Sequence, residues 1–80
     1  MTTMTEISDA FELGWMHIRQ LDKDEFQKEV MQYFDVTSYP AWLRRLRGEV
    51  PLDRNQAKDI EVIFRKYGVE TSKIWGRYEP

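Results

Sequence analysis

Three arginines form the densest group of potential binding side chains in this sequence. Arg44, Arg45 and Arg47 lie within the segment TSYPAWLRRLRGEVP, residues 37–51, of a chain whose formal net charge is −2. A guanidinium is permanently charged, and its planar fork of N–H groups fits a phosphate, a carboxylate or the edge of a guanine base. This segment therefore predicts recognition of an anion rather than catalysis.

Residue types that support catalysis or metal binding are scarce. The chain has no cysteine and a single histidine, His17, which lies far from the arginines in the sequence. A thiolate metal site is therefore impossible, and His17 has no nucleophile to activate. Asp24 and Glu25 would point about 100° apart on a helix, which does not suit a general acid–base pair. We expect no enzymatic activity, no metal and no cofactor.

The arginines lie on a helix expected over about residues 40–47. Pro40 suits its first position, because the N–H that proline lacks would be unpaired there, and Gly48 suits the left-handed residue after a helix end. A helical wheel places the apolar side chains on one arc, which consists of Trp42, Leu43 and Leu46. The opposite, open arc holds Pro40, Ala41 and Arg44, and Arg45 and Arg47 lie at the two flanks. The wheel therefore predicts that Trp42 belongs to the core and that the arginine side chains are exposed.

Two interpretations of this helix remain open. A short helix fits the DNA major groove, which is about 12 Å wide, and its arginines would contact guanine edges or phosphates. Ser38 and Tyr39 would project forward at its start, while Pro40 and Ala41 would allow a close approach. The alternative is a surface helix whose arginines are solvated or paired with Glu49, Asp53 or acids of the preceding helix.

The rest of the chain also shows helical periodicity, with no convincing strand alternation. A first helix, capped by Thr5 or Ser8, is expected to bury a stripe of apolar residues: Ile7, Ala10, Phe11, Trp15, Ile18 and Leu21. Gly14 interrupts that stripe, which either weakens the helix or lets a neighbour pack closely. A second helix begins with a capping-box-like Asp22 and Glu25. Its apolar positions are Phe26, Val30, Tyr33 and Phe34.

A fourth helix is expected between Asp53, which caps its start, and Gly68, which ends it. Its apolar positions are Ala57, Ile60, Ile63, Phe64 and Tyr67. In the short tail, residues 69–80, Ile74 and Trp75 are expected to fold back onto the core. The fold class predicted from these patterns is a compact all-α domain of four to five helices.

The bulk properties predict one small soluble domain that spans residues 1–80. No apolar run approaches a membrane span, and the N-terminal sequence MTTMTEISDA lacks the features of a signal peptide, so we expect a cytoplasmic protein. Residues 1–35 carry eight acids and three bases, a net −5, whereas residues 36–80 carry nine bases and six acids, a net +3. This split indicates a basic face or, alternatively, chance segregation of charge.

Taken together, residues 21–68 resemble the lambda-repressor-like helix-turn-helix domain of the Cro and xenobiotic-response-element families. The resemblance lies in the order and spacing of LDKDEF at 21–26, DVTS at 35–38, RLRG at 45–48, Pro51 and KYGV at 66–69. It covers about 48 of the 80 residues. It implies a sequence-specific DNA-binding transcriptional regulator from a bacterium or a mobile element, with double-stranded DNA as its partner.

The resemblance also implies the residues that contact DNA. Thr37 and Ser38 match the turn and the helix cap, and Arg47 matches a common phosphate contact. Lys23 stands at the start of the second helix, near the phosphate backbone. Base-facing and backbone-facing positions of the recognition helix correspond to Tyr39, Ala41, Arg44 and Arg45. Because a single module of this size binds weakly, a homodimer on a two-fold site is expected.

Two features depart from the family pattern. Asp35 replaces the usual glycine of the turn, so either it adopts an unusual backbone angle or the turn differs. Asp22, Asp24 and Glu25 place negative charge at the start of the second helix, which in the family faces DNA. These acids favour an alternative function, in which the domain is a protein–protein interaction module, such as an antirepressor or adaptor, that does not bind DNA.

Overall fold

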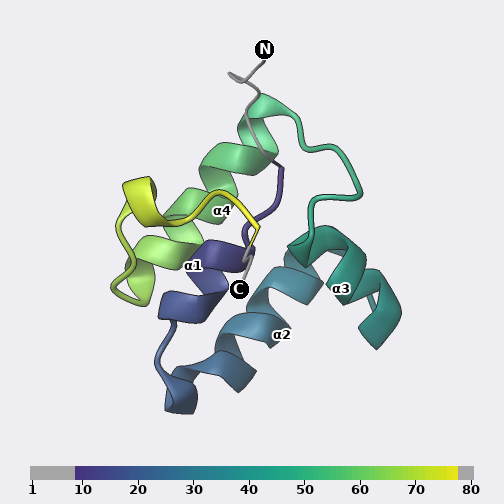
Figure 1. The fold of residues 1–80 in the computed structure, drawn as a ribbon. Coiled ribbons are helices and arrows are strands. Elements are labelled where there is room, and N and C mark those ends of the chain that lie inside the picture. The colour runs from purple at the N-terminus through teal and green to yellow at the C-terminus, as the bar shows by residue number, and fades with distance from the viewer. Residues whose placement is uncertain (1–8, 78–80) are drawn as a thin grey trace.

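The computed structural model describes residues 9–77, which form four α-helices and two short 3-10 helices (Figure 1). The elements in chain order are α1 (Glu12–His17), η1 (Gln20–Asp22), α2 (Lys23–Phe34), α3 (Tyr39–Leu46), α4 (Arg54–Lys66) and η2 (Thr71–Lys73). No β-strand forms in this part of the chain, where Phe11 and Gly76 make an isolated bridge. The expected all-α class is therefore confirmed. No helix within residues 9–77 is long and apolar enough to cross a membrane.

Aromatic rings from three helices and the chain before α1 meet at the centre of the core. The ring centroids of Phe26 and Phe64 lie 4.6 Å apart, and Phe11 lies 6.0 Å from both Phe64 and Trp42. These four side chains are at most 2% exposed. Burial of aromatic side chains contributes most of the apolar area in a core this small, so this cluster holds the helices together.

The first helix is shorter than its apolar stripe suggests. α1 begins at Glu12, because the residues before it pair with other segments: the Phe11 N–H donates to the Leu46 carbonyl at 3.1 Å. It ends before Ile18, whose backbone is extended. Ile18 remains buried, whereas Leu21 lies in η1 and is 78% exposed, so its expected core position is wrong. The expected Thr5 or Ser8 cap and Ile7 lie outside the described residues.

Gly14 is the point where the tail docks on α1. A Cβ atom at this position would lie 2.7 Å from the Phe64 ring and 3.0 Å from the Ile74 Cα, which is closer than real contacts allow. The Gly14 N–H donates to the Ile74 carbonyl at 2.9 Å, and Ile74 is fully buried. Of the two roles expected for Gly14, the structure therefore supports close packing of a neighbour.

The caps expected for α2 and α4 have different outcomes. Asp53 caps α4 in a reciprocal capping box, in which its side chain accepts from the Gln56 N–H at 2.8 Å and the Gln56 side chain accepts from the Asp53 N–H at 3.1 Å. Asp22 does not cap α2, so that expectation is wrong. Its backbone continues η1 directly into α2, and its carboxylate accepts from Arg19 Nε at 3.2 Å.

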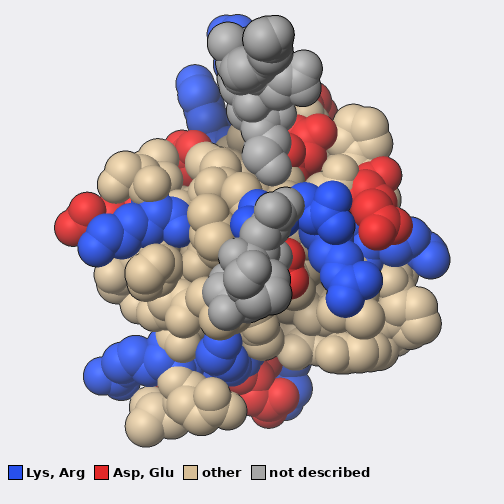
Figure 2. All heavy atoms as spheres, viewed as in Figure 1, with Lys and Arg blue, Asp and Glu red and all other residues tan. Residues whose placement is uncertain are grey.

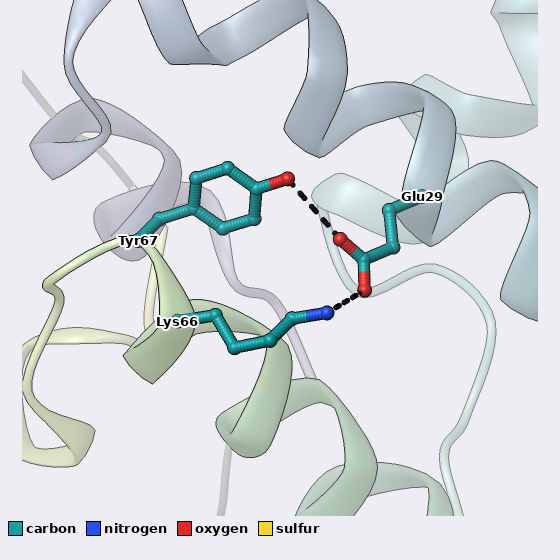
Figure 3. Close-up of polar contacts among 3 residues, drawn as sticks. All are labelled: Glu29, Lys66 and Tyr67. Atoms are coloured by element: carbon teal, nitrogen blue, oxygen red, sulfur yellow. Dashed lines mark hydrogen bonds and ion pairs between the residues drawn. The ribbon is translucent and has the colours of Figure 1, made fainter.

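Side chains of α2 and α4 form a polar seam that consists of Glu29, Tyr33, Asp59, Lys66 and Tyr67. The Glu29 carboxylate accepts from Lys66 Nζ and from the Tyr67 hydroxyl, the latter at 3.1 Å (Figure 3). The Tyr33 hydroxyl donates to the Asp59 carboxylate at 2.6 Å, and this hydrogen bond raises the pKa of Tyr33 to about 12. The seam therefore links α2 to α4 and to Tyr67, the residue that follows α4.

Candidate nucleic-acid interface

The turn between α2 and α3 spans residues 35–38 and reverses the chain at Asp35. Asp35 has φ 56° and ψ 44°, a left-handed conformation that aspartate tolerates better than most residues other than glycine. Its N–H donates to the Gln32 carbonyl at 3.1 Å, and the Val36 N–H donates to the Met31 carbonyl at 2.8 Å. Asp35 thus adopts the unusual backbone angle that its position in place of glycine predicted.

Ser38 begins α3 as its cap. Its backbone is extended, and its Oγ accepts from the Ala41 N–H at 3.3 Å. This confirms the capping role of Ser38 and places the helix start at Tyr39, one residue earlier than expected. Pro40 is consequently the second helical residue, where its missing N–H is still harmless. The adjacent Thr37 is exposed.

The inner side of α3 is anchored in the core. Trp42 and Leu46 are 2% and 4% exposed, and the Trp42 ring centroid lies 5.4 Å from that of Trp15. Gly48 follows the helix with φ 79°, and a Cβ atom there would lie 2.5 Å from the Ala10 nitrogen. The expected core role of Trp42 and the expected helix stop at Gly48 are both confirmed. α3 therefore presents a fixed outer side to solvent.

Arg45 does not lie on that outer side. Its guanidinium carbon sits 4.1 Å from the ring centroid of Phe34, and its Nη1 atom is buried without a hydrogen-bond partner among the described residues. Arg45 is half-buried, so the expectation of an exposed side chain is wrong. The cause is its place on the flank of α3 that faces the last residue of α2, where an aromatic face attracts the cation.

The outer ridge of α3 consists of Pro40, Arg44 and Arg47, which are spaced four and three residues apart and are all exposed. Within residues 9–77, neither arginine makes a side-chain hydrogen bond or an ion pair. The alternative of pairing with Glu49 or Asp53 is therefore not realised in the described structure. In the view of Figure 2, basic side chains lie on this side of the molecule with acidic side chains beside them, and further basic side chains lie over the rest of the same face.

The other expected contacts on α3 differ in exposure. Tyr39 is 61% exposed at the start of the helix and makes no side-chain hydrogen bond within the described residues. Ala41 is half-buried rather than on the open arc. Tyr39 is therefore available to a partner, and Ala41 contributes mainly a small surface that permits close approach.

Lys23 is turned toward α1. Its Nζ donates to the Trp15 carbonyl at 2.9 Å and lies 4.3 Å from the Trp15 ring centroid. Burial lowers the pKa of this ammonium. Lys23 thereby satisfies a carbonyl in the last turn of α1 and is less available for a phosphate contact. The sequence indicates this contact only through the tryptophan that lies eight residues before Lys23. Because the two residues belong to different helices, helical spacing does not predict that they meet.

The acids at the start of α2 lie far along that helix from α3. Asp24 pairs with Lys28 at 3.8 Å, and Glu25 is exposed. Glu25 and Phe34 are nine residues apart, which corresponds to about 13 Å along a helix. Because α3 packs near the C-terminal end of α2 (Figure 1), these acids do not cover the outer ridge.

Comparisons of this chain with protein-family models, curated proteins and solved structures found no match. A groove of about 630 Å³, which no residue of α3 lines, lies between the first turns of α4 and Trp75. Its lining combines the apolar Leu52 and Ala57 with the charged Asp9, Arg54 and Lys58. A function for the unit formed by α2, the turn and α3 must be inferred from its geometry and charge.

Proposed function

We propose that this chain is a sequence-specific DNA-binding transcriptional regulator with a lambda-repressor-like helix-turn-helix fold. One observation carries the proposal: α3 is anchored by Trp42 and Leu46, while its exposed side presents Arg44 and Arg47, which have no side-chain partner within residues 9–77. In this arrangement α3 lies in the major groove and α2 crosses the phosphate backbone.

The electrostatics of the interface come from a few side chains. The whole chain has a net charge of −2, so general attraction to DNA is weak and the contact depends on the local field of the outer ridge. A single module of this size binds one half-site, and two copies on a two-fold site would place their α3 helices in successive major grooves. The homodimer is part of this proposal.

Fluorescence anisotropy with duplex DNA at low and moderate salt tests the function. Binding should weaken as salt rises, because each neutralised phosphate releases counterions. The double substitution Arg44→Ala and Arg47→Ala should abolish measurable binding, whereas Arg65→Ala, on the exposed side of α4, should change affinity little. A folded protein that binds no duplex at low salt would refute the proposal.

A protein–protein interaction module without DNA binding is the second candidate. The internal contacts of Lys23 and Arg45 favour it, because they occupy two of the eight side chains expected at the DNA surface. The acids at the start of α2 also favour this candidate. In the helix-turn-helix arrangement this end of α2 would approach phosphates, which carry the same charge as the acids. The salt-dependent anisotropy measurement separates the two functions, because only the first requires binding to DNA.

A further inference from the structure

We infer that the groove beside Trp75 binds a small zwitterion with an apolar body, namely an α-amino acid with an aromatic side chain. The volume of the groove, about 630 Å³, lies within the range of about 300–1,000 Å³ that is typical of small-molecule sites. No residue of α2, the turn or α3 lines it. The site is therefore separate from the proposed DNA surface.

Trp75 gives the groove an aromatic wall that is already fixed in place. Its ring lies edge to face with Phe11, at a centroid distance of 6.4 Å, and its Nε1 donates to the Glu61 carboxylate at 2.8 Å. Leu52 and Ala57 add aliphatic surface to the same lining. Because these contacts hold the ring, a ligand can pack against it with little loss of conformational entropy.

Arg54 and Lys58 provide a place for a carboxylate. They are four residues apart on α4, which puts their Cβ atoms about 5–6 Å from each other on one side of the helix. Both are exposed, and neither makes a side-chain hydrogen bond or an ion pair within residues 9–77. Like charges at this spacing repel each other, so a carboxylate between them would relieve the repulsion. The positive end of the α4 dipole also favours an anion in these turns.

The three carboxylates of the lining differ in what they already bind. Asp53 accepts from the Gln56 N–H at 2.8 Å, and Glu61 accepts from the Trp75 indole. Asp9 has no side-chain partner among the described residues, so it remains available to a donor such as an ammonium group. Two available cations, one available carboxylate and an aromatic wall together match the carboxylate, the ammonium group and the side chain of an aromatic amino acid.

Titration of the isotope-labelled protein with phenylalanine, followed by NMR, tests this site. The amide signals of Arg54 and Lys58 and the indole N–H signal of Trp75 should shift together and saturate, with a Kd of about 1 mM for a ligand of this size. Hydrocinnamate lacks the ammonium group, and phenethylamine lacks the carboxylate. Each should bind about 2- to 5-fold more weakly than phenylalanine, because an exposed ion pair contributes modestly to affinity.

Substitutions that remove one charge should distinguish the two ends of the ligand. Lys58→Gln should weaken the binding of phenylalanine and hydrocinnamate by about 2- to 5-fold and should not weaken that of phenethylamine. Asp9→Asn should weaken the binding of phenylalanine and phenethylamine but not that of hydrocinnamate. The matched control is Arg65→Gln, which removes a positive charge from an exposed position on α4 outside the groove. It should change each of the three affinities by less than about 2-fold.

Phenylalanine shifts that do not saturate by about 20 mM would overturn the site. Equal effects of Lys58→Gln and Arg65→Gln would also overturn it, because the groove cation would then matter no more than a distant one. Equal affinities for the three compounds would mean that apolar contact alone drives binding and would overturn the assignment of a zwitterion. Since the titration contains no DNA, failure of this site and failure of the proposed DNA binding are distinguishable.

Discussion

The polar seam between α2 and α4 and the outer ridge of α3 both carry charged side chains, but they use them differently. In the seam, Glu29 accepts two hydrogen bonds and Asp59 accepts one from Tyr33. On the ridge, Arg44 and Arg47 have no such partner within the described residues. The difference indicates that the charges of the seam serve the fold, whereas the charges of the ridge are available to a ligand.

The largest expected effect comes from removing Trp42, the buried side chain that anchors α3 beneath the ridge. Trp42→Ala should lower the free energy of unfolding by about 3–5 kcal/mol, because it deletes a large buried ring and leaves a cavity. Urea denaturation followed by circular dichroism measures the change. Tyr39→Ala, at an exposed aromatic three residues earlier, is the control and should stay within about 0.5 kcal/mol of the wild type. Similar losses for both would show that α3 has no distinct inner and outer sides.

A double-mutant cycle tests the energetic role of the seam. Glu29→Ala should destabilise the protein by about 1 kcal/mol, since it removes an acceptor shared by Lys66 and Tyr67 at a partly exposed site. Combining it with Lys66→Ala should reveal a favourable coupling of about 0.5 kcal/mol between the two side chains. A coupling of zero would mean that these charges contribute no more to the fold than those of the ridge.

The tyrosine at the other end of the seam predicts an effect of pH. The Asp59 hydrogen bond raises the folded-state pKa of Tyr33 to about 12, above its ordinary value of 10. The stability that this hydrogen bond contributes is therefore complete below pH 10 and is lost as the pH rises from 10 to 12. Tyr33→Phe should reduce the loss of unfolding free energy between pH 10 and pH 12, which urea titrations at several pH values measure. A residual decrease is expected, because burial also raises the pKa of Tyr67. An unchanged pH profile would contradict the role of Tyr33.

The smallest expected effect is on the ridge itself. Arg44→Ala combined with Arg47→Ala should change the free energy of unfolding by less than about 0.5 kcal/mol, because both side chains are exposed and unpaired in the described structure. Thermal unfolding of the double variant, compared with the wild type, measures this. A loss above about 1 kcal/mol would show that the ridge supports the fold and would remove the contrast with the seam.

Local signals in the sequence predicted the ends of α3 and α4 and the buried side of α3. Ser38 and Asp53 cap their helices, Gly48 and Gly68 end them in the left-handed conformation, and Trp42 is buried as its place on the wheel predicted. The caps and helix ends depend on interactions within about four residues, which spacing and residue type describe well. The burial of Trp42 follows from the apolar periodicity of its helix. The exposure of Arg44 follows from the same periodicity, which places Arg47 on a flank of the helix.

The tertiary structure alone decided which cationic side chains lack a partner among residues 9–77. Arg45 and Lys23 resemble their exposed neighbours in the sequence, but Phe34 and Trp15 hold them through contacts between different helices. The length of α1 was decided in the same way, since the Phe11 N–H bonds to the Leu46 carbonyl rather than within a helix. Helical periodicity shows which residues share a side of one helix, but it does not show which residue of another helix lies opposite.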